Sequence, residues 1–97
     1  MEVIQFDACE LFRVRKIGTQ GYPDGTVHIR RHVDGINGNS NKKATIDEFC
    51  NPRNLPIKMF VRIYSDDKAF ADSIINYIKR STKIKIMIEF EVRDGLN

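Results

Sequence analysis

Two stretches in the C-terminal half of the chain alternate between apolar side chains and other side chains. In residues 57–64, which read IKMFVRIY, every second side chain is aliphatic or Met, and the alternation returns in residues 83–93. A period of two predicts β-strands with two unlike faces. Strands that are buried on both faces, as in doubly wound parallel sheets, have continuous apolar runs instead. We therefore expect a sheet that is covered on one face only.

Between these two strands, the spacing of the apolar side chains changes to that of a helix. Phe70, Ile74 and Ile78 are four residues apart and form one apolar stripe. Ser65 is a residue type that is favoured as an N-cap. The pattern predicts a helix over about residues 66–80, and a strand, helix and strand in this order predict a β-α-β unit with a right-handed crossover.

The first 33 residues have the pattern of a β-hairpin. Apolar side chains alternate to about Ile17 and are interrupted at Glu10, which predicts a bulge or bend at Glu10 and the residue before it. Residues 23–25 read Pro-Asp-Gly, a strong turn sequence because Pro presets φ and Gly permits a positive φ. Residues 26–33 follow as the return strand.

The middle of the chain has the composition of a loop and then a helix-start motif. Residues 34–45 are rich in Gly, Asn, Ser, Asp and Lys, which predicts a polar loop. Thr45, followed three residues later by Glu48, matches a capping box and predicts a short helical turn over residues 46–50. The two prolines that follow exclude a longer helix.

Together these elements predict an α+β fold. We expect a two-layer sandwich, with one main helix packed on one face of a mostly antiparallel sheet of four to five strands. The 97 residues are expected to form a single domain, because a chain of this length builds one hydrophobic core. Within it, a β-hairpin part (1–33) and a polar loop (34–45) precede a short helical turn with the β-α-β unit (46–97).

The distribution of charge over the predicted sheet is more informative than the net charge of the chain. The formal net charge is +3 and the pI about 9.0, values that permit an anionic partner without requiring one. The strand alternation places eight Lys and Arg against three Asp and Glu on the sheet face opposite the helix, if the register holds. The basic residues in this set are Arg13, Arg15, Arg30, Lys58, Arg62, Lys83, Lys85 and Arg93, and the acidic ones are Asp7, Glu89 and Glu91.

Two aromatic residues alternate with basic ones on the same expected face. Phe60 and Tyr64 lie between and beside Lys58 and Arg62. Bases stack on exposed aromatic side chains while basic side chains contact phosphates. The arrangement resembles sheet-platform RNA-binding proteins in architecture, although their short motif of Gly and several aromatic residues is absent.

We therefore expect a small, non-enzymatic module that binds nucleic acid, with RNA or a single strand preferred. The expected binding residues are Lys58, Phe60, Arg62, Tyr64, Lys83, Lys85, Arg13, Arg15, His28 and Arg30.

Two other functions fit the same residues. The first is a protein-binding accessory or inhibitor protein of phage or mobile-element type, which would bind a host protein or nucleoprotein complex through the 34–45 loop and the sheet face. A homodimer through the strand at residues 83–93 is a further possibility. The second is a metal-independent ribonuclease, in which His28 or His32 would act as general acid or base beside Arg30.

Several classes of site and location are not expected. His28 and His32 are about 13 Å apart on one strand, too far to bind one metal, and the two cysteines belong to no C-x-x-C motif. We expect no catalytic residues, no metal and no cofactor. No apolar run approaches the roughly 18 residues of a membrane helix, and the acidic start is unlike a signal peptide. These features predict a cytoplasmic protein with free thiols and no membrane partner.

Overall fold

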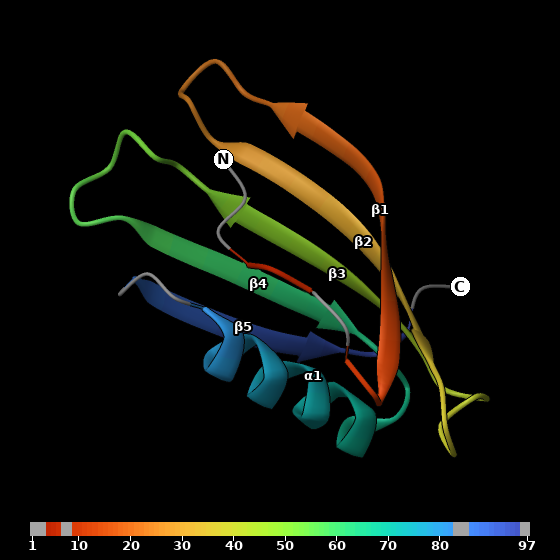
Figure 1. Ribbon diagram of the computed structural model, residues 1–97. Coiled ribbons are helices and arrows are strands. Elements are labelled where there is room, and N and C mark those ends of the chain that lie inside the picture. The colour runs from red at the N-terminus through yellow and green to blue at the C-terminus, as the bar shows by residue number, and fades with distance from the viewer. Residues whose placement is uncertain (1–3, 7–8, 83–85, 96–97) are drawn as a thin grey trace.

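The computed structural model describes residues 4–6, 9–82 and 86–95. Within them, five strands form one sheet in chain order, and one helix lies along a face of that sheet (Figure 1). The elements are β1 (Phe12–Gly21), β2 (Val27–Gly35), β3 (Lys43–Cys50), β4 (Lys58–Tyr64), α1 (Lys68–Ser81) and β5 (Met87–Arg93). The predicted α+β fold with a mostly antiparallel sheet and one helix is confirmed.

The sheet combines an antiparallel meander with one parallel pair. Strands β1 to β4 are each antiparallel to the next, whereas β4 and β5 are parallel. A parallel pair needs a crossover connection, and α1 provides it. The predicted β-α-β unit is therefore present, and β1 and β5 are the two edge strands.

The core lies between the sheet and α1. On β4, Met59, Val61 and Ile63 are buried while the side chains between them are less buried, as the alternation predicts. The apolar stripe of α1 is buried opposite them. The buried apolar cluster consists of Ile4, Phe12, Val33, Ala44, Ile46, Met59, Val61, Ile63, Phe70, Ala71, Ile74 and Ile78.

Beside α1, a charged pair and the N-terminal residues complete the covered face. Arg31 and Glu48 form an ion pair whose side chains are 9% and 3% exposed, and the Arg31 guanidinium lies 4.9 Å from the centre of the Phe6 ring. Phe6 also stacks on Tyr77 of α1. Residues 4–6 are not in a strand, so the alternation that predicted one there reflects packing of Ile4 and Phe6 onto the core.

The predicted helical turn at residues 46–50 is wrong, because this segment belongs to strand β3. Two ladders of hydrogen bonds, to β2 and to β4, stabilise the extended backbone here. Glu48 binds Arg31 instead of closing a capping box with Thr45. The predicted polar loop at 34–45 is correspondingly too long, since β2 ends at Gly35 and β3 begins at Lys43.

The start of α1 also differs from the sequence prediction. The N-cap of α1 is Asp67, whose carboxylate accepts a hydrogen bond of 2.9 Å from the Phe70 N–H, so the helix starts two residues later than expected. Ser65 is buried before it, and its hydroxyl oxygen accepts a hydrogen bond from the Asp67 N–H. The bend predicted near Glu10 is observed at Glu10 and Leu11, and a separate register shift between β1 and β2 lies between Lys16 and Gly18.

The hairpin turn between β1 and β2 follows the prediction. The Tyr22 carbonyl accepts a hydrogen bond from the Gly25 N–H at 2.9 Å, and Gly25 has a φ of 95°. Within the described residues, no helix has the length and apolar character needed to cross a membrane. The predicted strand at residues 83–93 is observed as β5 from Met87 onwards, and residues 83–85 lie outside the described part.

Candidate functional site

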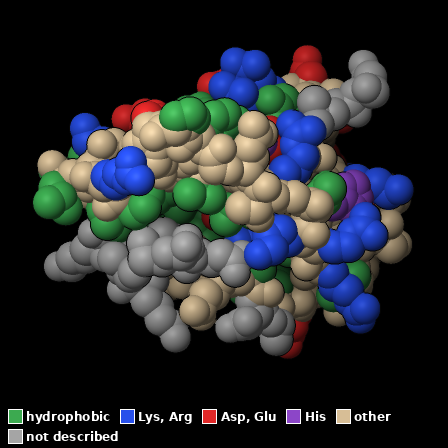
Figure 2. All heavy atoms as spheres, turned by 90° about the horizontal axis from the view of Figure 1, so that it is seen from above, with side chains coloured by type: hydrophobic (Ala, Val, Ile, Leu, Met, Phe, Trp, Pro, Cys, Tyr) green, Lys and Arg blue, Asp and Glu red, His purple; other side chains and the backbone are tan. Residues whose placement is uncertain are grey.

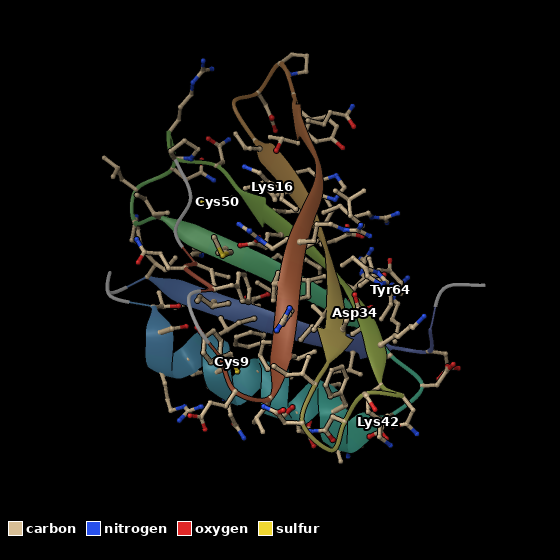
Figure 3. All side chains as sticks on the ribbon, turned by 45° about the vertical axis from the view of Figure 1, so that its right-hand side comes forward. Cys9, Lys16, Asp34, Lys42, Cys50 and Tyr64 are labelled. Carbon is tan, nitrogen blue, oxygen red and sulfur yellow. The ribbon has the colours of Figure 1, made fainter. Side chains whose placement is uncertain are left out.

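The face of the sheet that points away from α1 is called the open face below. Residues directly opposite each other in neighbouring strands share a face, so the ladder registers define its side chains. In Figure 3, Tyr64 and Asp34 lie on this face, whereas Cys9 and Cys50 lie on the side of α1. The open face is the one that the sequence analysis selected as the binding surface.

One row of side chains across the open face is aromatic. Gln20, His28, Phe49 and Phe60 are consecutive partners on β1, β2, β3 and β4. The His28 ring stacks on Phe49 with a centroid distance of 4.4 Å and an interplanar angle of 8°, and the Phe49 and Phe60 centroids are 6.2 Å apart. These half-buried rings form a continuous aromatic strip, the aromatic row.

The next row, called the charged row, alternates in sign. Arg30, Asp47, Arg62 and Glu91 are consecutive partners on β2 to β5. The Arg30 Nε and Nη2 atoms donate hydrogen bonds of 2.8 Å to the two carboxylate oxygens of Asp47, and the Arg62 Nε lies 3.6 Å from Glu91. Most of the charge in this row is therefore compensated within the sheet.

Asp47 is the centre of the charged row. It is only 2% exposed, and besides Arg30 it is 2.9 Å from Nε2 of His28. Burial alone would raise the pKa of Asp47, but the hydrogen bonds from Arg30 and His28 outweigh it and hold the pKa below its ordinary value. The hydrogen bond with Asp47 raises the pKa of Arg30 in turn. Asp47 is thus ionised and fixes both basic side chains in place.

Three of the four residues predicted on β4 lie in contact with one another. The Arg62 guanidinium lies 5.3 Å from the Phe60 ring centre, and its Nη1 donates a hydrogen bond of 3.2 Å to the Tyr64 hydroxyl. Arg62 therefore offers a flat guanidinium over Phe60 rather than a free charge. Lys58 is exposed at the start of β4 and has no ion pair among the described residues.

Two arginines on β1 are exposed and available to an anion. Arg13 lies opposite Asp34 and Arg15 opposite His32, and neither arginine has a hydrogen bond or ion pair within the described part of the chain. Figure 2 shows Lys and Arg side chains gathered around a histidine, on the side where β1 and the end of β2 lie in Figure 1. This edge of the open face is its most basic part.

The net charge of the open face is smaller than the sequence indicated. Asp34 and Asp47 belong to it and were not counted, while Asp7, Lys83 and Lys85 lie outside the described residues. Among the described residues, seven basic side chains face four acidic ones. The basic ones are Arg13, Arg15, Arg30, Lys43, Lys58, Arg62 and Arg93, and the acidic ones are Asp34, Asp47, Glu89 and Glu91.

Sequence reasoning missed the contribution of β3. Asp47 and Phe49 occupy the centre of the open face, but the capping-box interpretation placed them in a helical turn. A usable signal was present, because Ala44 and Ile46 alternate with Thr45 and Asp47 as in a strand.

The two histidines contact different carboxylates and do not lie together as the ligands of one metal would. His28 Nε2 contacts Asp47, and His32 Nε2 lies 3.2 Å from Asp34. The part of the chain that the structure describes holds no cluster of three or more potential metal-binding side chains. A hollow of about 370 Å³ adjoins His28 and Arg30 and is otherwise bounded by residues 18–20 of β1.

The open face combines aromatic rings, oriented polar groups and exposed arginines, an arrangement suited to binding. No protein-family model matches the chain, and neither the curated proteins nor the solved structures contain a match to it.

Proposed function

We propose that this protein is a non-enzymatic module that binds single-stranded nucleic acid, preferably RNA, on the open face of a two-layer sandwich. The observation that carries the proposal is the aromatic row of His28, Phe49 and Phe60, which lies on the face not covered by α1, the same face that carries the exposed arginines of β1. A cytoplasmic location is part of the proposal, since both cysteines are free thiols.

The two parts of the face have separate roles in this proposal. The rings of Phe49 and Phe60, with the guanidinium of Arg62, provide flat surfaces for unstacked bases, and each stacked base contributes about 1–3 kcal/mol. Arg13 and Arg15 bind phosphates, because they have no internal partner to lose among the described residues. Lys58 extends the basic contacts at the other end of the face.

The test is fluorescence anisotropy with a labelled single-stranded RNA of mixed sequence at low and moderate salt. We expect dissociation constants in the micromolar range or tighter at low salt. Replacing Phe49→Leu and Phe60→Leu together keeps apolar volume but removes two stacking surfaces, so affinity falls by about tenfold or more.

The matched control for this experiment is Phe90→Leu. Phe90 is opposite Val61 and packs against the core on the covered face of the sheet, so its loss leaves RNA affinity unchanged. No anisotropy change at low salt, or an equal loss in the control, would show that the open face does not bind nucleic acid in this way.

A protein partner is the second candidate function, and one observation favours it. Tyr22 and Leu55 are 40% and 88% exposed, and exposed apolar side chains that lie together are typical of protein-binding surfaces. The Asn51 side chain donates a hydrogen bond of 3.0 Å to the Asp24 carbonyl, which brings the β3–β4 loop next to the hairpin turn. In this reading the end of the sheet binds a host protein or a second copy of the chain.

Two measurements distinguish this candidate. A stoichiometric complex that survives nuclease treatment and is lost in Leu55→Ser supports a protein partner. Sedimentation mass reports a homodimer directly. Complexes that disappear on nuclease treatment favour the nucleic-acid proposal instead.

A further inference from the structure

The hollow beside the aromatic row has the dimensions and polar groups of a small binding site. Its volume is about 370 Å³, and Gly18, Thr19, Gln20, His28 and Arg30 bound it. The irregularity in β1 after Lys16 places Gly18 opposite Arg30, and no atom lies within 4 Å of the position that a Cβ of Gly18 would occupy. The hollow is thus open because residue 18 has no side chain.

Arg30 is held with one edge of its guanidinium turned to Asp47. The Nε and Nη2 atoms both donate to that carboxylate, which is 2% exposed within the sheet. The remaining edge, formed by Nη1 and the second hydrogen of Nη2, has no partner among the described residues, and the Arg30 side chain is 41% exposed. This edge is a preorganised fork of two parallel N–H donors.

The charge around this fork favours a neutral ligand group over a phosphate. Asp47 compensates the positive charge of Arg30, whereas Arg13 and Arg15 on the same face have no described acidic partner. A phosphate gains more from the uncompensated arginines than from Arg30. A pair of neutral acceptors gains full benefit from the fork, since directional hydrogen bonds do not require net charge.

We propose that the hollow binds a guanine base of the single strand, with the Arg30 fork donating to its O6 and N7 atoms. This inference rests on the proposed function. Guanine presents these two adjacent acceptors, and their pairing with an arginine fork is the commonest specific contact in the major groove of DNA. The Gln20 amide at the rim of the hollow offers a further donor and acceptor.

On the edge that corresponds to O6 and N7 of guanine, the other bases do not match the fork. Adenine has an amino donor where guanine has O6, so one N–H of Arg30 would face another donor. Cytosine likewise presents an amino group, and uracil offers a single carbonyl on that edge. The Asp47 carboxylate prevents Arg30 from rotating to adapt, because rotation would break two hydrogen bonds to a buried charge.

The experiment uses the full chain and labelled 12-mers of uridine in which one central base is varied. The varied base is uracil, guanine, adenine, hypoxanthine or 7-deazaguanine. Hypoxanthine, the base of inosine, retains O6 and N7, whereas 7-deazaguanine lacks N7. We expect guanine and hypoxanthine to bind roughly 5- to 150-fold more tightly than adenine, and 7-deazaguanine to lose most of that advantage. Equal affinities for guanine, adenine and 7-deazaguanine would overturn the inference.

The all-uridine 12-mer separates this inference from the proposed function. Binding of that oligomer without any preference for guanine refutes the guanine site alone, whereas no binding of any oligomer refutes both.

Two glycines of β1 provide a matched pair of variants. Gly18→Leu fills the hollow, and the backbone at Gly18 does not have a positive φ that would oppose a side chain. Gly21 has equally open surroundings but does not line the hollow, so Gly21→Leu is the control. We expect Gly18→Leu to abolish the guanine preference while keeping affinity for the all-uridine 12-mer, and Gly21→Leu to keep both. A guanine preference that persists in a folded Gly18→Leu protein contradicts the site.

Discussion

Arg30 and Asp47 face each other across β2 and β3, and two hydrogen bonds of 2.8 Å join the guanidinium to both carboxylate oxygens. The carboxylate is almost fully buried, so its charge depends on this partner and on His28. The pair therefore contributes to stability and to the geometry of the open face at the same time.

Replacing Asp47→Asn should destabilise the protein by about 2 kcal/mol in urea denaturation. The change leaves Arg30 without a compensating charge, but the cost stays below that of a fully buried pair because the Arg30 side chain is 41% exposed. Asp34→Asn is the control, since the Asp34 side chain is 54% exposed, and its effect should stay within about 0.5 kcal/mol. If the two variants lose the same amount of stability, the hydrogen bonds of Asp47 do not stabilise the fold.

Lowering the pH should decrease the unfolding free energy of the wild-type protein more steeply than that of the Asp47→Asn variant. The folded-state pKa of Asp47 is lowered, so its contribution is fully present above the unfolded pKa of about 4 and is lost as pH falls through the lower folded value. The pKa values of Asp24 and Asp67 are also lowered, by the Thr26 N–H and by Lys42 respectively, but they titrate in both proteins. The unfolding free energies of the wild-type protein and the Asp47→Asn variant should therefore converge as the pH falls from about 5 to about 2. Parallel curves would contradict a lowered pKa of Asp47 in the folded state.

The buried pair Arg31–Glu48 should respond differently to single and double replacement. Glu48→Gln alone should cost about 3 kcal/mol, because a buried guanidinium then loses the charge of the Glu48 carboxylate. Arg31→Met together with Glu48→Leu should recover most of that loss, since both costs of burying a charge disappear. Thermal and urea unfolding of the two variants provide the comparison. A double variant as unstable as the single one would indicate that the pair holds Phe6 in a way that apolar packing cannot replace.

The hairpin turn should not tolerate a side chain at Gly25. A Cβ there would lie 2.7 Å from Cδ of Arg53, and the φ of 95° is unfavourable for other residues. Gly25→Ala should therefore destabilise the protein by about 1–2 kcal/mol in urea denaturation. Gly21→Ala, in extended backbone with open surroundings, should be neutral or slightly stabilising.

The salt dependence of RNA binding should identify the phosphate contacts. Arg13→Gln with Arg15→Gln removes two contacts, so the slope of log K against log salt should decrease in magnitude by about 1.4. Lys68→Gln with Arg80→Gln removes the same charge from exposed positions on α1 and should leave the slope unchanged. Affinity titrations between about 50 and 200 mM salt measure both slopes. If the α1 variant changes the slope equally, the phosphates are bound elsewhere.

The C-terminal half of the fold was predictable because local pattern and tertiary environment agree there. The alternation around Met59 and the helical spacing of Phe70 and Ile74 each specify one buried face, and the structure buries those faces against each other. The placement of Phe60, Arg62 and Tyr64 on the open face follows from the same parity.

Strand β3 was not predictable in this way because its local signals conflict. Thr45 and Glu48 have the spacing of a capping box, yet hydrogen bonding to two neighbouring strands and the ion pair with Arg31 favour an extended backbone. Neither neighbour is visible in the local sequence. The residues that β3 adds to the open face, Asp47 and Phe49, were missed for the same reason.

The sequence alone determined that one sheet face would be apolar and the other would carry basic and aromatic side chains, since a period of two fixes the parity of every strand. Only the tertiary structure decided which charges remain available. Asp47 and Glu91 compensate Arg30 and Arg62 across strands that are distant in the chain, while Arg13 and Arg15 on the edge strand have no such partner among the described residues. Coulomb interactions depend on distances in space, and these distances are set by the order and register of the strands.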